Sequence, residues 1–199
     1  MNLFTLRRVL LPCLSLLIPG QLLSKPSTLP PEVVVVLYNT EDENSKRLAL
    51  HYAKARSIPE DNLVGLPIPA GDEISREQFN QKIRTPLCRI FDDRSWWVRK
   101  VGSNGQKQPI TLKRRVLVTM RGVPFKIART LDTIPEGQAN KRPFTPNPKG
   151  NEASVDSELS LMGIEGYEIA GQIPNPYFRK DQSLLDLANP GILLVSRID

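Results

Sequence analysis

Val33-Val34-Val35-Val36-Leu37-Tyr38 is the stretch that decides the fold of this chain. The run is continuously apolar and rich in β-branched residues, whereas a strand with one face in water alternates apolar and polar positions. It therefore predicts a central strand covered on both faces, which is typical of a parallel sheet in an α/β protein.

The segments that follow this strand continue the pattern of a β-α-β unit. A helix is predicted from Asn44 to Arg56, with Asp42 or Asn44 as its N-cap. Its apolar residues recur toward one side at helical spacing, namely Leu48, Leu50, Tyr52 and Ala53. Ile58-Pro59 ends this helix, and the next strand is predicted from Asn62 to Leu66.

A second helix is predicted from Ser75 toward Phe91. Ser75 and Gln78 have the spacing of a capping box, and Pro86 should bend or interrupt the helix. Apolar residues follow at four-residue intervals, namely Phe79, Ile83 and Leu87. Residues 94–115 then hold seven cations and no acid, with glycine and proline interruptions, and are expected to form an exposed insertion or hairpin.

Two more buried-strand patterns complete the alternation, at Val116 to Met120 and at Ile192 to Ile198. Between them lie a Pro-rich loop at about 135–150 and a helix that Ser154 can cap, which turns Val155, Leu159 and Met162 toward the core. The predicted fold is α/β, a mostly parallel sheet with helices on both faces, in a Rossmann-like or flavodoxin-like three-layer arrangement. Because a final strand is normally covered by a further helix, the fold is expected to be incomplete at the C-terminus.

The first 24 residues have the order of a signal peptide. Arg7 and Arg8 precede an apolar run from Val9 to Ile18, and the small Ser24 follows a helix-breaking Pro19-Gly20. The run is shorter than the roughly 20 residues that span a membrane. Export with removal of residues 1–24 is therefore expected, an uncleaved anchor being the alternative. Residues 25–32 would form a linker and residues 33–199 a single α/β domain.

The number of cysteines and the net charge bear on the cellular location of the protein. After removal of the leader, Cys88 would be the only cysteine, so no intramolecular disulfide can form. This fits a Gram-negative periplasm or the cell exterior. The net charge of +6 is a mild surplus whose distribution matters more than its sum.

Several short motifs occur along the mature chain in a recognisable order. They are Tyr38-Asn39-Thr40, Ala49-x-x-Tyr52-Ala53, Ile58-Pro59-x-x-Asn62-Leu63-Val64, Ile74-Ser75-Arg76-x-x-Phe79, Val118-Thr119-x-Arg121-Gly122-Val123-Pro124, Ala153-Ser154-Val155-Asp156-Ser157-Glu158-Leu159 and Leu194-Val195-Ser196-Arg197-Ile198-Asp199. The ordered set resembles an uncharacterised family of exported bacterial proteins that co-occurs with the PEP-CTERM and exosortase sorting system. Members of that family continue beyond the equivalent of Asp199, so the resemblance implies a C-terminally truncated member. It implies an envelope or extracellular-matrix context and no settled reaction.

Candidate site residues follow from the rule that open parallel sheets bind ligands beyond the carboxyl ends of their strands. Asn39, Arg121 and Asp199 come just past predicted strands and are the ligand-binding candidates. Asp156, Glu158 and Arg121 are the catalytic candidates, since paired carboxylates share acid and base roles or bind a metal and an arginine fork holds an anion. The alternative is that the acids match a helix dipole and that Arg121 is a surface or salt-bridged residue.

No standard enzyme motif occurs, and no cofactor or metal is indicated. Cys88 and His51 both fall in predicted helices, where a packed thiol and a solvated imidazole are more usual than a catalytic pair. The chain is expected to be an exported accessory or binding module of the envelope or matrix. The alternative is a hydrolase, metal-assisted or not, that cleaves a peptide or glycan at the acidic site. A nonfunctional fragment, the third interpretation, would expose apolar surface beside the final strand.

The basic insertion is a candidate partner surface. Its tryptophans and cations are Trp96, Trp97, Arg99, Lys100, Lys113, Arg114 and Arg115. Cations follow anionic polymers and indoles stack or insert at interfaces, so the candidate partner is an anionic polysaccharide or a membrane surface. No nucleic acid is expected for an exported protein. The preferred interpretation is a solvated loop whose tryptophans pack back on the core.

Overall fold

The computed structural model describes residues 29–102, 105, 107–129, 152–165 and 191–199. The expected leader, the Pro-rich loop at 135–150 and the first half of the linker lie outside these residues. From the linker, Pro31–Val33 forms a short 3-10 turn that leads into the first strand.

The main sheet has four strands, all parallel, and gives the molecule its α/β class. These strands are β1 (Val34–Asn39), β2 (Leu63–Leu66), β6 (Val116–Met120) and β9 (Leu194–Ile198), in the spatial order β2-β1-β6-β9. The predicted bounds of β6 are confirmed, and β2 and β9 begin one and two residues later than the sequence pattern indicates.

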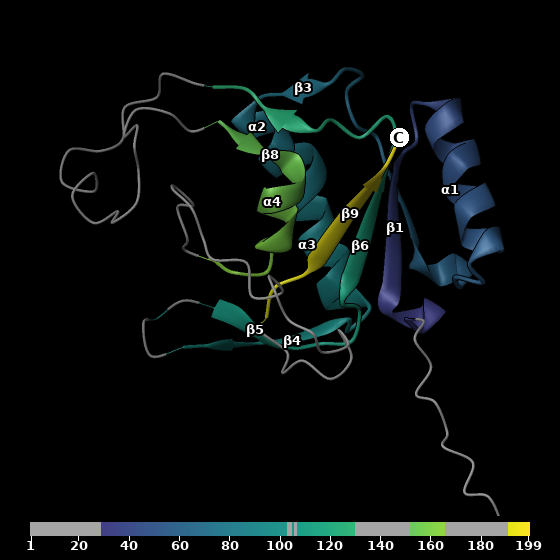
Figure 1. Ribbon diagram of the computed structural model, residues 1–199. Coiled ribbons are helices and arrows are strands. Elements are labelled where there is room, and N and C mark those ends of the chain that lie inside the picture. The colour runs from purple at the N-terminus through teal and green to yellow at the C-terminus, as the bar shows by residue number, and fades with distance from the viewer. Residues whose placement is uncertain (1–28, 103–104, 106, 130–151, 166–190) are drawn as a thin grey trace, which may run out of the picture.

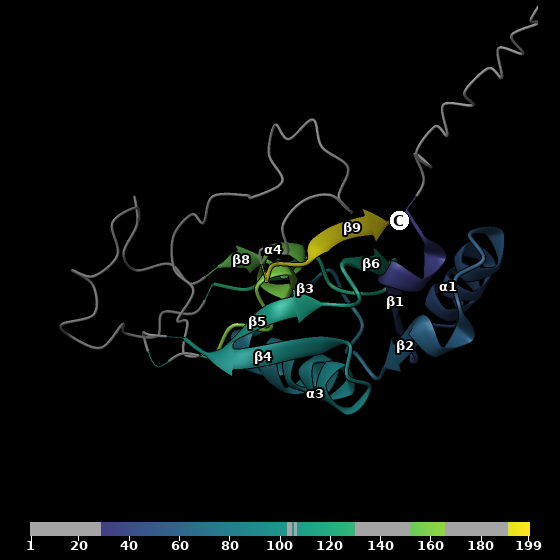
Figure 2. The same cartoon turned by 90° about the horizontal axis from the view of Figure 1, so that it is seen from below.

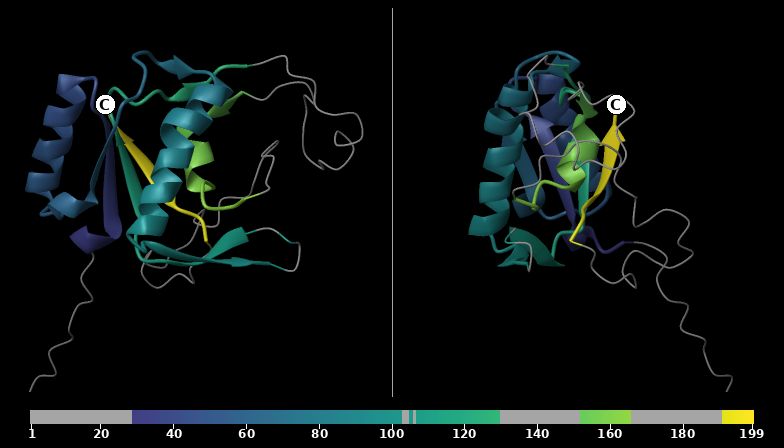
Figure 3. Two further views of the ribbon diagram at one scale, coloured as in Figure 1. Left: turned by 180° about the vertical axis from the view of Figure 1, so that it is seen from behind. Right: turned by 90° about the vertical axis from the view of Figure 1, so that its left-hand side faces the viewer.

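Both faces of β1 are buried, as its uninterrupted apolar run predicts. Val35 and Leu37 join the core cluster beneath α2, α3 and α4, whereas Val34 and Val36 join a second cluster beneath α1. The alternation follows from the two-residue period of a strand. Figure 1 shows α1 on one side of the sheet and the other helices opposite, and Figure 3 shows the teal α3 lying across the sheet face seen from behind.

Helix α1 (Glu43–Ala55) begins at Asp42, whose Oδ1 accepts a hydrogen bond from the amide of Asn44 at 2.8 Å. Its buried residues are Ser45, Ala49 and Ala53, spaced by four. The expectation that Leu50 lies on this inner side is wrong, because it is 52% exposed. One residue turns a helix by about 100°, which carries Leu50 away from the line through Ala49 and Ala53.

The second predicted helix is interrupted before Pro86. It consists of α2 (Arg76–Phe79), the π-helical turn η3 (Asn80–Arg84) and α3 (Thr85–Asp93). Both bonds of the predicted Ser75–Gln78 capping box are present. Since proline has no N–H and its ring crowds the preceding turn, the widened turn accommodates it. The four-residue pattern is confirmed, because the fully buried side chains are Phe79, Ile83, Leu87 and Phe91.

The basic insertion is an antiparallel hairpin, β4 (Trp97–Val101) and β5 (Lys107–Leu112). It lies at the amino-terminal end of the main sheet, where the Arg115 amide donates to the Val33 carbonyl. Trp96 and Trp97 are each only 4% exposed and pack on Phe91, with ring centroids 5.1 and 4.9 Å apart. The tryptophans therefore belong to the core, as the preferred interpretation predicts.

A small second sheet, which the sequence patterns do not predict, lies at the opposite end. Its strands are β3 (Glu73–Ile74), β7 (Lys126–Ile127) and β8 (Ala153–Ser154). Helix α4 (Val155–Ser160) follows β8 directly, and Val155, Leu159 and Met162 are fully buried as expected. Ser154 holds the N-cap position, but its side chain makes no capping bond. No helix within the described ranges is long and apolar enough to cross a membrane.

Candidate functional site

The carboxyl ends of the parallel strands meet at the upper edge of the sheet in Figure 1, here called the rim. The chain leaves β1 toward β2 on one side, whereas β6 and β9 lie on the other. A reversal of strand order of this kind separates the loops that follow the two strands and leaves a crevice for ligands. The rim between β1 and β6 is therefore the first place to look for a site.

Asn39, at the end of β1, holds several loops of the rim together. Its Oδ1 accepts hydrogen bonds from the amides of Ile68 at 3.1 Å and Glu41 at 3.0 Å, and its Nδ2 donates to the Gly122 carbonyl at 3.1 Å. The side chain is almost completely buried, with 1% exposure. These bonds make Asn39 a framework residue of the site, and its direct contact with a ligand stays a prediction.

Gly122 brings the loop after β6 against the first turn of α1. Its φ of +89° lies in the region that favours glycine. A Cβ atom there would lie 2.6 Å from Oδ2 of Asp42 and 3.0 Å from the Cβ of Ser45. Only glycine permits this approach, which places the preceding Arg121 beside the amino-terminal end of α1.

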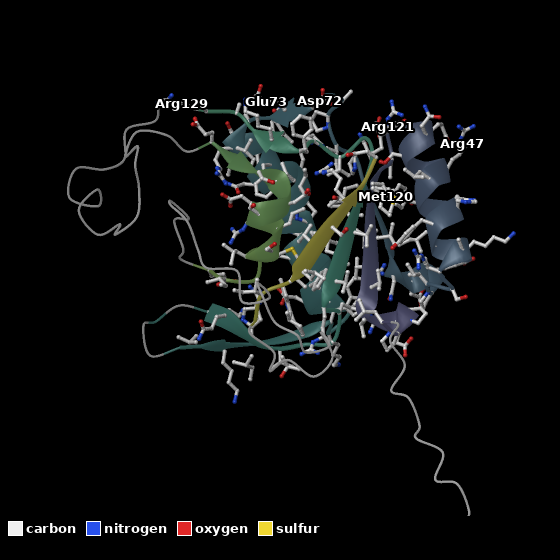
Figure 4. All side chains as sticks on the ribbon, in the orientation of Figure 1. Arg47, Asp72, Glu73, Met120, Arg121 and Arg129 are labelled. Carbon is white, nitrogen blue, oxygen red and sulfur yellow. The ribbon has the colours of Figure 1, made fainter. Side chains whose placement is uncertain are left out.

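Arg121 is an exposed cation of the rim. Its amide donates to the Ile198 carbonyl at 2.7 Å, which fixes the backbone between β6 and β9. Within the described part of the chain, its guanidinium has no hydrogen bond or ion pair. Figure 4 shows it between α1 and the end of β9, on the same rim as Arg47, Asp72 and Glu73. Asp199, also exposed, ends the chain one residue beyond Ile198.

Asp156 belongs to a partly buried polar cluster beside the rim, in which its carboxylate is already paired. Arg197 donates two hydrogen bonds to its carboxylate, from Nε to Oδ2 at 2.9 Å and from Nη2 to Oδ1 at 2.7 Å. The Thr119 hydroxyl donates a third, to Oδ1 at 3.2 Å. Arg197 also donates to the carbonyls of Val123 and Pro124. This cluster ties the first turn of α4 to β6, β9 and the loop after β6.

Glu158 engages a different element. Its carboxylate lies 2.9 Å from Nη1 of Arg76 on α2, and the residue is 4% exposed. Residues two apart on a helix are about 200° apart around the axis, so Asp156 and Glu158 project from opposite sides of α4. The structure thus pairs the two acids with separate arginines. No group of three metal-ligating side chains occurs among the described residues, and the hydrolase alternative stays a prediction.

Cys88 and His51 lie on helices that cover opposite faces of the sheet. His51 is exposed on α1, while the Cys88 thiol on α3 donates to the Met162 carbonyl at 3.2 Å. Burial raises the pKa of this thiol to about 11, although Arg84 and Arg99 act in the opposite direction. The thiol is therefore protonated at neutral pH and has no basic partner in the imidazole.

The cations of the hairpin divide into paired and unpaired groups. Arg99, with only 6% of its side chain exposed, lies 2.6 Å from both Asp92 and Glu165, and it stacks over Trp97. Its Nε is buried without a hydrogen-bond partner. Arg114 donates to Asn62 at 3.1 Å and also lies over Trp96. Lys100 and Lys113 are exposed.

The sequence interpretation did not identify the partners of the two acids. Arg197 falls within the last predicted strand, and neither Arg76 nor Thr119 is among the candidate site residues. The two-residue separation of Asp156 and Glu158 on a helix was a usable signal, because it excludes a shared pocket on one helix face. Which arginine faces which acid depends on packing between segments far apart in the sequence.

Compared with known proteins, the chain matches no family model, no curated protein and no solved structure.

Proposed function

We propose that this chain is an exported binding module of the bacterial envelope or extracellular matrix that recognises the carboxylate group of an acidic polysaccharide at the rim. Arg121 would hold the carboxylate with its guanidinium fork, a geometry that suits carboxylates. The exposed Thr40, Glu41 and Asp199 would accept hydrogen bonds from sugar hydroxyls. The leader-like residues 1–24 and the resemblance to the PEP-CTERM-associated exported family support the location.

The observation that carries the proposal is the exposed guanidinium of Arg121 at the reversal of strand order, which has no hydrogen bond or ion pair with another described residue. Of the other arginines near this rim, Arg197 is bound to Asp156 and two carbonyls, and Arg47 donates to Oδ1 of Asn44. Asn39 and Gly122 hold the Arg121 loop against α1, so the cation is presented on a fixed backbone. A preorganised backbone lowers the ordering cost of binding.

The strand order also supports a finer fold assignment. In the order β2-β1-β6-β9, the second strand of the sheet lies on one side of the first strand and the later strands lie on the other side. This is the flavodoxin-like order. We assign the domain to this doubly wound class, in which ligands commonly bind at the rim between the first and third strands of the sheet. In that comparison β6 takes the third position, and the hairpin β4–β5 is an insertion before it.

The proposal is tested by titrating the protein with a short uronic-acid oligosaccharide and with its methyl ester, using calorimetry. The acid form is expected to bind at least about tenfold more tightly than the ester, because charge-assisted hydrogen bonds contribute about 1.5–3 kcal/mol. Arg121→Gln should reduce binding of the acid form to the level of the ester.

Arg56→Gln is the matched control, because Arg56 is an exposed arginine at the C-cap of α1, at the other end of the sheet. It should bind the acid form as the wild-type chain does. Equal affinity of wild type and Arg121→Gln for the oligosaccharide would contradict the proposal, as would equal binding of acid and ester.

A further inference from the structure

The hairpin β4–β5 has one face in the core and one in solvent. Trp97 and Leu112 pair across the hairpin and are buried, whereas the neighbouring pair Val98 and Thr111 is exposed. The register shifts next to Val98, so that Ile110 is the extra residue of a bulge. The outer face consequently shows Ile110 beside Thr111, together with Lys100 and Gln108 in the next exposed pair.

Three aliphatic side chains are exposed on this one hairpin. Val98 is 44% exposed, Ile110 43% and Val101, at the end of β4, 68%. They account for three of the five large hydrophobic residues that are exposed in the described part of the chain. Single exposed aliphatics are ordinary, but a group on one short element is more typical of an interaction surface.

Among the described residues, the charges exposed beside these side chains are positive. Residues 94–115 contain no acid, and the two acids that reach the hairpin from elsewhere, Asp92 and Glu165, are bound to Arg99 beneath it. Lys100 and Lys113 stand exposed beside the aliphatics. Apolar side chains next to exposed lysines complement a surface with apolar chains and anionic head groups, which a soluble polyanion does not offer.

The place of the hairpin in the molecule favours the same partner. Figure 2 shows it from below, at the end of the molecule opposite the rim. The Arg115 amide, just after β5, is bonded to the Val33 carbonyl, just before β1. The segment that leads into β1 therefore lies beside the base of the hairpin.

From these features we propose that the outer face of the β4–β5 hairpin docks on an anionic lipid surface. Val98 and Ile110, which lie on this outer face, enter the interfacial region, and Lys100 and Lys113 contact the head groups. The rim then faces away from the bilayer. This docking surface is separate from Arg121, so each proposal can fail without the other.

Hydrogen exchange of the full chain, read by mass spectrometry of peptides, tests the docking. The peptide readout separates the hairpin from any contribution of residues 1–28. Vesicles of phosphatidylglycerol and phosphatidylethanolamine should slow exchange across residues 97–112, and phosphatidylcholine vesicles should not. Val98→Ser with Ile110→Ser should abolish the slowing, since each buried carbon contributes about fourfold in affinity, equivalent to about 0.8 kcal/mol. Lys100→Gln with Lys113→Gln should weaken binding about fivefold per lysine.

Leu50→Ser is the matched control, because it removes an exposed aliphatic side chain from α1 and should leave the slowing intact. Hydrogen exchange in β1 and β6 reports whether each variant is folded. If the serine variant is unfolded, the lysine variant decides the outcome. Absence of slowing with anionic vesicles would overturn the proposal. Slowed hydrogen exchange that persists in both the serine and the lysine variants would also overturn it. If a soluble acidic polysaccharide slows exchange equally, and the serine substitutions do not change this effect, the hairpin is a glycan-binding surface instead.

Discussion

At the scale of single residues, the same type of side chain has different roles according to burial. Arg99 and Arg197 are largely buried and bound to carboxylates, whereas Arg121 is exposed without a partner among the described residues. Taking an arginine out of water is costly unless it is paired, so the first two stabilise contacts between segments. Only the third retains its hydrogen-bonding capacity for a ligand.

Cys88 gives a prediction at this scale. Because burial raises its pKa from 9.0 to about 11, the folded protein at pH 8 holds about a hundredfold less thiolate at this residue than the unfolded chain. Alkylation by iodoacetamide should be slower by at least that factor in buffer than in urea. Peptide mass spectrometry separates Cys88 from Cys13, and comparable rates in both solvents would contradict the burial of the thiol.

The same shift has a consequence for stability. Between pH 9 and pH 11 the unfolded chain loses this proton and the folded protein keeps it, so the free energy of unfolding falls as the pH rises through this range. Below pH 9 the contribution is constant. In Cys88→Ser this part of the pH dependence should be absent.

At the scale of elements, helix α4 connects the two halves of the described core through its two acids. Asp156 on one side binds Arg197 of β9, and Glu158 on the other binds Arg76 of α2. The helix has only six residues, too short to be stable by itself. Its position therefore depends on these tertiary contacts and on the burial of Val155 and Leu159.

Asp156→Asn tests this dependence. The substitution keeps the size of the side chain but removes the charge that the partly buried Arg197 fork grips, so we expect a loss of about 2 kcal/mol in urea unfolding. Glu73→Gln removes one partner of the exposed Lys126–Glu73 pair and should change stability by less than about 1 kcal/mol. Equal small effects would mean that the Asp156 cluster contributes little to the fold.

At the scale of the whole molecule, stability depends on covering the parallel sheet from both sides. Strand β1 contributes fully buried residues to both core clusters, Val35 and Leu37 to one and Val36 to the other. Among the described residues no disulfide reinforces this arrangement, and Cys88 is free. Packing on the two faces should therefore count about equally.

Val35→Ala and Val36→Ala test the two faces separately. Each removes two buried methyl groups at a fully buried position, so each should lower the free energy of unfolding by about 2 kcal/mol. Val101→Ala, at an exposed position, should stay within about 0.5 kcal/mol. A large effect from only one of the two buried valines would show that one face of the sheet is poorly covered in solution.

Local patterns in the sequence determined the elements that are long, periodic or capped. The apolar run at β1, the capping box at Ser75, the four-residue spacing of α3 and the buried strand β6 all follow from the periods of strands and helices, which neighbouring residues alone define. Placing Asn39 and Arg121 at the ends of parallel strands was likewise enough to bring them to one rim. Those parts of the fold and of the candidate site were predictable.

Tertiary structure decided the rest, because it depends on which distant segments pack together. The two-residue strands β3, β7 and β8 have no period of their own and exist only as paired with one another. The separate arginine partners of Asp156 and Glu158, the burial of Trp96 and Trp97 on Phe91 and the unpaired state of Arg121 all arise between residues far apart in the chain or on different elements. Ion pairing and burial are set by three-dimensional neighbours, so composition and spacing located the charged residues without showing which of them remain open to a ligand.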